Sequence, residues 1–232
     1  MSENTSTITM DDSQGFHMYQ KDGKSYPSVT TILGAVSYNK FIVRWANRLG
    51  FQHKDYEDAL KQTADEGTLM HAGAQALVDP EHGAMPVIKD ALTEYYVRQR
   101  LDGLRLKLKF HEGNWSTIFT ESPFVSDTYG IGGTLDWYSM WYGKKTLFDF
   151  KSSSGLRDKH LLQLGGYDLI LQDNGITIDQ AGIILVKRDN CIINIFDRPI
   201  IDELAKYFLT VKQYYYESKR TTEIVSAPAE IL

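Results

Sequence analysis

Residues 130–151, GIGGTLDWYSMWYGKKTLFDFK, give the clearest indication of the fold in this sequence. Its two halves are rich in Thr, Phe, Trp and Tyr, which favour strands. The four residues YGKK at 142–145 separate the halves and are typical of a tight turn. We therefore predict a β-hairpin made of residues 130–142 and 145–151.

The sequence on both sides of this hairpin alternates between the periods of strands and helices. Asn174-Gly175 is a typical left-handed helix stop. The predicted elements are a strand at 115–121, a helix at 158–171, strands at 180–187 and 191–196, and a helix at about 201–217.

The first half of the chain reads as helical. Ser28 is a good N-cap for a helix at 29–33, and Ser37 or Asn39 can start a second helix that Gly50 ends. Longer helices are predicted at 55–78, with a weak point at Gly67, and from Pro86 or Asp90 to Leu108.

This order of elements predicts one mixed sheet covered by helices, an α/β fold with an N-terminal helical region. The expected plan is a single domain at 27–219, divided into a helical region at 27–110, an α/β core at 111–200 and a C-terminal helix at 201–219. Residues 1–26 are expected to form a polar tail or extended segment, and residues 220–232 a second tail.

Composition excludes several classes of protein. The chain has 232 residues, 42% of them hydrophobic, and contains no apolar run of about 18 residues, so we expect no membrane partner. Its polar, acidic start is unlike a signal peptide. The lone Cys191 cannot form an internal disulfide or an iron–sulfur site, which fits the cytoplasm. The net charge of −5 argues only weakly against nucleic-acid binding, because the position of the charge matters more.

The chemistry is concentrated in the hairpin. Asp149-Phe150-Lys151 ends an apolar strand, and Asp136 lies thirteen positions upstream on the preceding strand, so the hairpin can bring the two carboxylates together. A divalent cation would neutralise their repulsion. Lys151 shares the face of Asp149 and can activate water or stabilise the transition state, while the backbone carbonyl of Phe150 is a further candidate ligand.

These residues resemble the RecB-like nucleases of the PD-(D/E)xK superfamily, whose metal motif is Gly-x-x-Asp followed by Asp-x-Lys. Gly133 to Asp136 and Asp149 to Lys151 match it, QLGGY at 163–167 resembles the Gln-x-x-x-Tyr helix, and GTLMH at 67–71 resembles Gly-x-x-x-His. PSVTTIL at 27–33, followed by Arg44-Trp45, is similar to mitochondrial genome maintenance exonucleases and related phage exonucleases. The likeness covers roughly residues 26 to 200.

The resemblance implies a restriction-endonuclease-like core and a Mg²⁺ or Mn²⁺ ion held by His71, Asp136 and Asp149, with no iron–sulfur cluster. It also implies that Gln163 and Tyr167 face the DNA and the active site. The expected substrate is DNA that is single-stranded or has a free end. A bacterial or phage origin is expected, the latter with a location in the host cytoplasm.

Other candidates keep two interpretations each. Glu121 is a further metal ligand or simply closes a strand, and Tyr167 contacts DNA or belongs to the core. Ser152 and Ser153 contact phosphates or merely turn the chain. A last group, on the second predicted helix, holds a single strand by phosphate pairing and stacking, or forms a solvated basic face: Arg44, Trp45 and Arg48.

The sequence thus predicts a DNA exonuclease in repair, recombination or replication, with Asp136, Asp149, Lys151 and Gln163 as catalytic residues. A structure-specific endonuclease and a noncatalytic DNA-binding subunit of a recombination complex are the alternatives. Polarity, processivity, preference for DNA over RNA, oligomeric state and the recombination or replication partners do not follow from the sequence.

Overall fold

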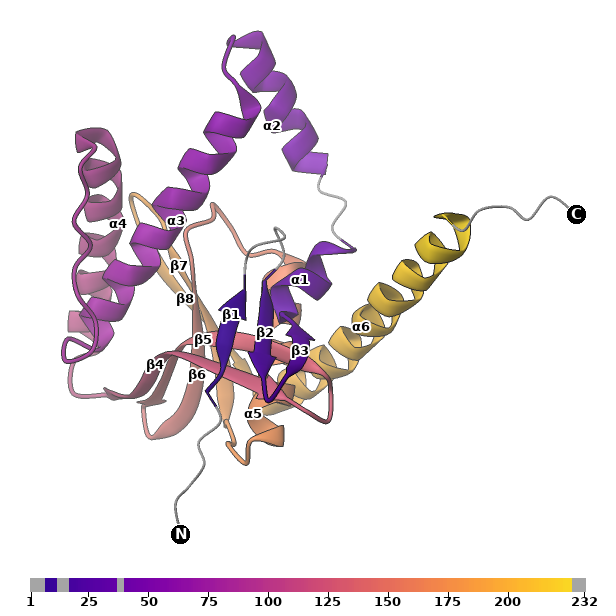
Figure 1. Ribbon diagram of the computed structural model, residues 1–232. Helices are drawn as coiled ribbons and strands as arrows, with labels where there is room; N and C mark the ends of the chain where they lie inside the picture. Colours follow the sequence, from indigo (N-terminus) through magenta and orange to yellow (C-terminus); the bar gives the residue numbers. More distant parts are fainter. Residues whose placement is uncertain (1–6, 12–16, 37–39, 227–232) are drawn as a thin grey trace, which may run out of the picture.

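The computed structural model describes residues 7–11, 17–36 and 40–226. Within them the chain forms two sheets and six helices, arranged as Figure 1 shows. The strands are β1 (Thr9–Asp11), β2 (Met18–Lys21), β3 (Lys24–Pro27), β4 (Trp115–Ser126), β5 (Ile131–Trp141), β6 (Lys144–Lys151), β7 (Gln180–Val186) and β8 (Cys191–Asp197). The helices are α1 (Val29–Gly34), α2 (Lys40–Phe51), α3 (Tyr56–Val78), α4 (Ala91–Phe110), α5 (Asp158–Asp173) and α6 (Arg198–Ser226).

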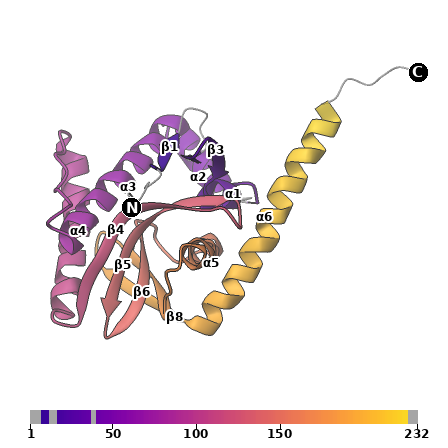
Figure 2. The same ribbon diagram turned by 60° about the horizontal axis from the view of Figure 1, so that its bottom comes forward.

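The larger sheet has five strands in the order β4-β5-β6-β7-β8, and the smaller one has the order β1-β2-β3. Every neighbouring pair is antiparallel except β6 and β7, which are parallel and therefore need the crossover that α5 provides. Helices flank the larger sheet, with α3 and α4 on one side and α5 and α6 on the other (Figure 2). The prediction of a mixed α/β fold is confirmed.

The predicted hairpin is present, and its turn explains its register. Tyr142 and Gly143 both have positive φ, 51° and 74°, as the two central residues of a tight hairpin turn require. Strand pairing then runs from Trp141 opposite Lys144 to Trp137 opposite Phe148. Continued by one pair, this register places Asp136 opposite Asp149.

Two apolar cores lie on the two faces of the larger sheet. Val29 and Ile32 of α1 join residues of α5 and α6 in one core. Met70 of α3 and Leu104 of α4 pack on Trp137 in the other. Burial on both faces fixes the sheet, so the ends of β5 and β6 are held from both sides.

Some boundaries differ from the prediction. Helix α6 continues to Ser226, so the tail predicted from residue 220 is wrong for its first part. Side-chain hydrogen bonds between residues four apart, such as Gln213 to Glu217 at 2.8 Å, support the helix beyond the apolar pattern. The expected extended segment at 1–26 contains three paired strands. Helix α3 is unbroken at Gly67, because one glycine costs only about 1 kcal/mol in a helix.

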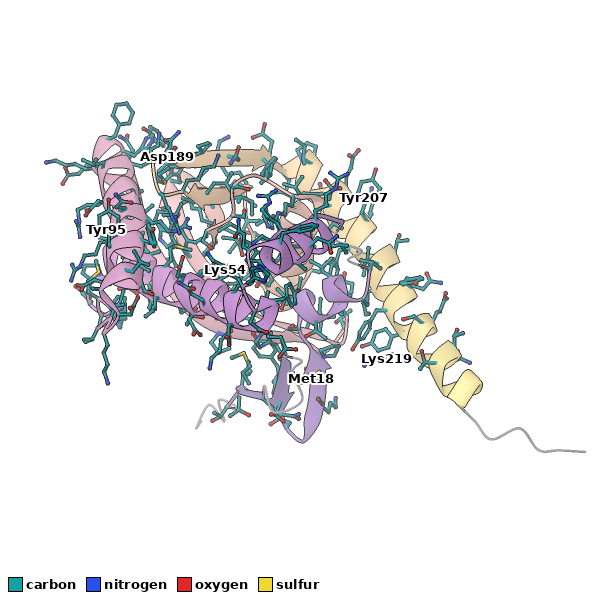
Figure 3. The ribbon with its side chains drawn as sticks, turned by 90° about the horizontal axis from the view of Figure 1, so that it is seen from above. Met18, Lys54, Tyr95, Asp189, Tyr207 and Lys219 are labelled. Atoms are coloured by element: carbon teal, nitrogen blue, oxygen red, sulfur yellow. The ribbon has the colours of Figure 1, made fainter. Side chains whose placement is uncertain are left out.

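Helix α2 and parts of α3 and α6 lie away from the sheets. Figure 1 shows α2 and the first part of α3 above the sheets, and we call α2 with residues 56–66 the helical arm. The second half of α6 extends outward, with Lys219 on it in Figure 3. No helix in the described ranges is long and apolar enough to cross a membrane. The predicted helix starts at Ser37 and Asn39 lie outside the described residues.

Candidate metal centre

Helix α3 brings His71 to the edge of the sheet. Its buried residues Met70 and Ala74 anchor the helix, and Gly73 lets α4 approach closely, since a Cβ there would lie 2.3 Å from Leu101 Cδ1. His71 follows Met70 directly and keeps 29% of its side chain exposed. The helix therefore presents His71 at the rim of the core rather than inside it.

Strand β5 changes the direction in which its side chains face at Asp136. Leu135 belongs to the core under α5, whereas Trp137, two positions on, belongs to the core under α3 and α4. Asp136 lies between them and is 7% exposed. Across the strand pair, Glu121 has a positive φ of 41°. This irregular backbone turns both carboxylates toward His71, which the regular alternation of a strand does not predict.

Three side chains from three elements converge there. One ligand atom each of His71, Glu121 and Asp136 lies within 4.8 Å of the others. His71 Nδ1 is 3.3 Å from Asp136 Oδ2, which also accepts a hydrogen bond from the backbone N–H of Phe150 at 2.8 Å. Glu121 does not close the strand, as one interpretation had it, because pairing with β5 continues β4 to Ser126, beyond the predicted end at residue 121. Its carboxylate instead joins His71 and Asp136.

Asp149 lies beside this group, held by other partners. Its Oδ1 accepts hydrogen bonds from Lys151 Nζ and from Gln163 Nε2, both at 2.9 Å. Lys151 Nζ also lies 2.7 Å from Asp149 Oδ2, yet this buried oxygen accepts no hydrogen bond from the described residues. Gln163 Nε2 donates in addition to Tyr167 Oη at 2.8 Å. Asp149 thus has one satisfied oxygen and one that can still take a ligand.

Burial shifts the acids of the site in one direction. It is the largest cause that raises the pKa of Glu121 to about 8, followed by the charges of Asp136 and Asp149. Burial also raises the pKa of Asp136 and of Asp149 to about 6, although Lys151 opposes the shift in both. Three carboxylates that resist ionisation in this way form a site in which a cation would stabilise the charged forms.

His71 is shifted toward its neutral form. Burial, followed by the positive charge of Lys151, lowers the pKa of His71 to about 4. The side chain of Phe150 is buried in the core beneath α3 and α4, and its ring lies edge-on to the His71 ring with centroids 6.4 Å apart. Neutral imidazole is the form that binds metal, so His71 needs no proton loss at neutral pH.

A divalent cation fits this donor set. One imidazole nitrogen and several carboxylate oxygens suit Mg²⁺ or Mn²⁺, and Asp149 Oδ2, which is paired with Lys151 but accepts no hydrogen bond from the described residues, is a further candidate donor. His71 and Asp136 are brought together as predicted, and Glu121 completes the group. Asp149 is adjacent but turned toward Lys151 and Gln163, so its place as a direct ligand stays a prediction.

The predicted DNA contacts lie in different settings. Arg44 and Arg48 are exposed on the helical arm, where Trp45 packs edge-on against Tyr56 with ring centroids 5.6 Å apart. Tyr167, by contrast, is 5% exposed within the core, so its burial favours support of Gln163 over contact with DNA.

The loop after β6 is tied down from two sides. Ser153 Oγ donates to the carbonyl of Gly155 at 2.9 Å. Arg100 Nη1 donates to the carbonyls of Ser152 and Val186, at 3.0 and 2.9 Å. This role of Arg100 could not be predicted from the sequence, because a contact between α4 and a distant loop leaves no periodic pattern.

No family model and no curated protein sequence matches this chain. Among solved structures, the protein described as SSO0001 is similar over 71% of this chain and 86% of that one, with 17% sequence identity and a TM-score of 0.26. A similarity at this level carries no argument about fold or function. The interpretation therefore depends on the geometry of the site.

Proposed function

We propose that this protein is a divalent-metal-dependent deoxyribonuclease of the PD-(D/E)xK superfamily, RecB-like branch, with a restriction-endonuclease-like core. One observation carries the proposal: ligand atoms of His71, Glu121 and Asp136 lie within 4.8 Å of one another, next to the Asp149–Lys151 pair. An acidic cluster with a neutral imidazole and an adjacent ammonium is suited to hydrolysis of phosphate esters.

The residues of the site have two roles, metal binding and orientation of the attacking water. His71, Glu121 and Asp136 would hold Mg²⁺ or Mn²⁺, with the Phe150 carbonyl and Asp149 Oδ2 as additional donors. When bound, such an ion polarises a phosphoryl oxygen and lowers the pKa of water. Lys151 keeps its ammonium 2.7 Å from Asp149, and from there it can orient the attacking water and stabilise negative charge on the phosphate.

Gln163 acts on the reaction through Asp149. Its amide donates to Asp149 Oδ1 and also contacts Tyr167, so the carboxylate is held with its other oxygen facing the Lys151 ammonium. We treat Gln163 as a positioning residue rather than as a group that contacts the phosphate.

The preferred substrate is DNA with a single-stranded or frayed end, in repair, recombination or replication. The helical arm supports this choice, since Arg44 and Arg48 are exposed on the helix that carries Trp45. Exposed arginines can pair with phosphates while an aromatic ring stacks on bases.

Digestion of end-labelled single- and double-stranded DNA with Mg²⁺, with Mn²⁺ and with EDTA tests the activity. We expect cutting with either metal and none in EDTA. Binding without cutting under all conditions would reject the nuclease and favour a noncatalytic DNA-binding subunit.

A linear and a circular form of the same single strand then test the requirement for an end. We expect the linear form to be degraded and the circle to survive. Equal rates on both would move the protein to the endonuclease class and leave the metal chemistry in place.

A further inference from the structure

Helix α5 begins beside the metal centre with a group of basic side chains. Gln163, which contacts Asp149, is three and four positions from His160 and Lys159, so the three lie along one side of the helix. Helical side chains lean toward the N-terminus, which carries Lys159 and His160 past the first turn toward the loop after β6. Arg157, at the N-cap, adds a third basic residue.

These basic residues have no acidic partner. No ion pair or side-chain hydrogen bond joins Arg157, Lys159 or His160 to any residue in the part of the chain that the structure describes. Asp158 lies in the same turn, but it is exposed, and Arg157 gives the helix start no side-chain cap. Among the described residues, no side chain therefore caps the backbone N–H groups at the start of α5.

His160 gives the second, independent indication of a ligand. Its side chain is 3% exposed, and its Nδ1 is buried with no hydrogen-bond partner among the described residues. Buried polar atoms are normally satisfied, so an unpartnered one needs an explanation. The backbone N–H of His160 donates to the carbonyl of Arg157 at 2.9 Å, so His160 lies in the same turn as Arg157 and directly follows Lys159.

We propose that Arg157, Lys159 and His160 form a phosphate-binding subsite at the start of α5, for a phosphate of the nucleic-acid strand next to the one that is cut. This proposal rests on the proposed function. An oxyanion there meets two exposed cations and the open first turn of a helix, and it gives His160 Nδ1 a partner. Lys151 pairs with Asp149 at the metal centre, and its charge also acts on His160.

Salt dependence of binding tests the subsite separately from cleavage. A fluorescein-labelled single-stranded oligonucleotide is titrated in EDTA with wild type, Arg157→Gln and Lys159→Gln, over a range of salt concentrations. Each variant should bind about tenfold more weakly at low salt, and its slope of log affinity against log salt should be shallower by about 0.7. Both residues are exposed, so the variants should fold.

Lys144→Gln is the matched control. Lys144 is exposed at the other end of β6, seven residues and roughly 23 Å from Lys151 along the strand, and should leave the slope unchanged. Oligonucleotides with a 5′-phosphate and with a 5′-hydroxyl are compared. If the variants lose affinity only for the 5′-phosphorylated oligonucleotide, the subsite binds a terminal phosphate. If they lose affinity equally for both oligonucleotides, it binds an internal phosphodiester, and either result supports the subsite.

Slopes of Arg157→Gln and Lys159→Gln equal to that of the wild type would overturn the proposal. A wild type that shows the expected slopes in EDTA but cuts nothing with Mg²⁺ or Mn²⁺ would instead reject the proposed nuclease and leave the subsite standing.

Discussion

The candidate metal centre and the helical arm place their charges in opposite settings. Asp136 and Asp149 are 7% and 1% exposed and are fixed by named hydrogen bonds, whereas Arg44 and Arg48 point into solvent. A charge in a buried site interacts strongly with its neighbours, and one in water is screened. Substitutions in the centre should therefore have large effects, and those in the arm small ones.

Replacement of Asp149 by Asn should have the largest effect. The change removes the carboxylate that contacts Lys151 and Gln163, and about 10³-fold of the cleavage rate should be lost, as for other groups that act on charge in a transition state. Cleavage of end-labelled DNA measures this, with circular dichroism to check the fold. Substantial metal-dependent activity in the Asp149→Asn protein would show that the hairpin is not part of the active site.

Replacement of Gln163 by Met should have an intermediate effect. Asp149 then loses one donor, and loss of a positioning partner costs roughly 10- to 100-fold. The fall should be in kcat rather than KM, and the acidic limb of the pH profile should move to higher pH, because the amide donor favours the ionised carboxyl.

Gln172→Met is the control for this change. Gln172 lies on the same helix and donates to Asp168 at 2.6 Å, away from the centre. It should alter stability alone. An unchanged pH profile in Gln163→Met would assign Gln163 a purely structural role.

The stability of the metal-free protein should depend on pH through the buried acids of the centre, Glu121 above all. Glu121 has a pKa of about 8 in the fold against an ordinary value of 4.5, so the folded state binds more protons than the unfolded chain between pH 6.5 and 8.5. The metal-free protein should lose stability as pH rises through this window. Asp136 and Asp149 have a pKa of about 6, so their effect, also a loss of stability with rising pH, falls below this window. His71, with a pKa lowered to about 4, has the opposite effect in that lower range, where stability rises with pH.

Thermal unfolding at pH 6.5 and 8.5, in EDTA and with saturating Mn²⁺, measures this effect. The gain in Tm from Mn²⁺ should be larger at pH 8.5, because metal replaces the proton that Glu121 would otherwise need. Glu121→Gln should remove most of the difference. A metal-free Tm that rises across the window would show that Glu121 is not held in this site.

Substitutions in the helical arm should have the smallest effects. Arg44→Gln and Arg48→Gln should each weaken binding of single-stranded DNA a few-fold and make the salt slope shallower by about 0.7, with kcat unchanged. Fluorescence titration against salt measures both quantities. Losses as large as that of Asp149→Asn would mean that the arm belongs to the catalytic machinery.

The same contrast explains what could be predicted from the sequence. The hairpin sequence combines strand-forming residues with residues typical of a tight turn. The relative positions of Asp136, Asp149 and Lys151 could therefore be predicted. The role of Glu121 could not be predicted, because its positive φ and the irregular alternation of side chains along β5 depend on tertiary packing. His160 was missed, since an unpartnered ring nitrogen is visible only once its surroundings are known.

The length of α6 could not be predicted for a related reason. Its final turns extend beyond the body, where apolar periodicity no longer marks the helix. A side-chain hydrogen bond between residues four apart, from Gln213 Nε2 to Glu217 Oε1 at 2.8 Å, supports it there instead.

The location of bound Mn²⁺ shows whether His71, Glu121 and Asp136 form a metal site, and contaminating nucleases cannot produce this result. Crystals soaked in Mn²⁺ should show anomalous density between His71, Glu121 and Asp136, beside Asp149, and His71→Asn should weaken solution binding at least about 100-fold. Density elsewhere, or unchanged affinity in His71→Asn, would contradict a metal-dependent active site at this position.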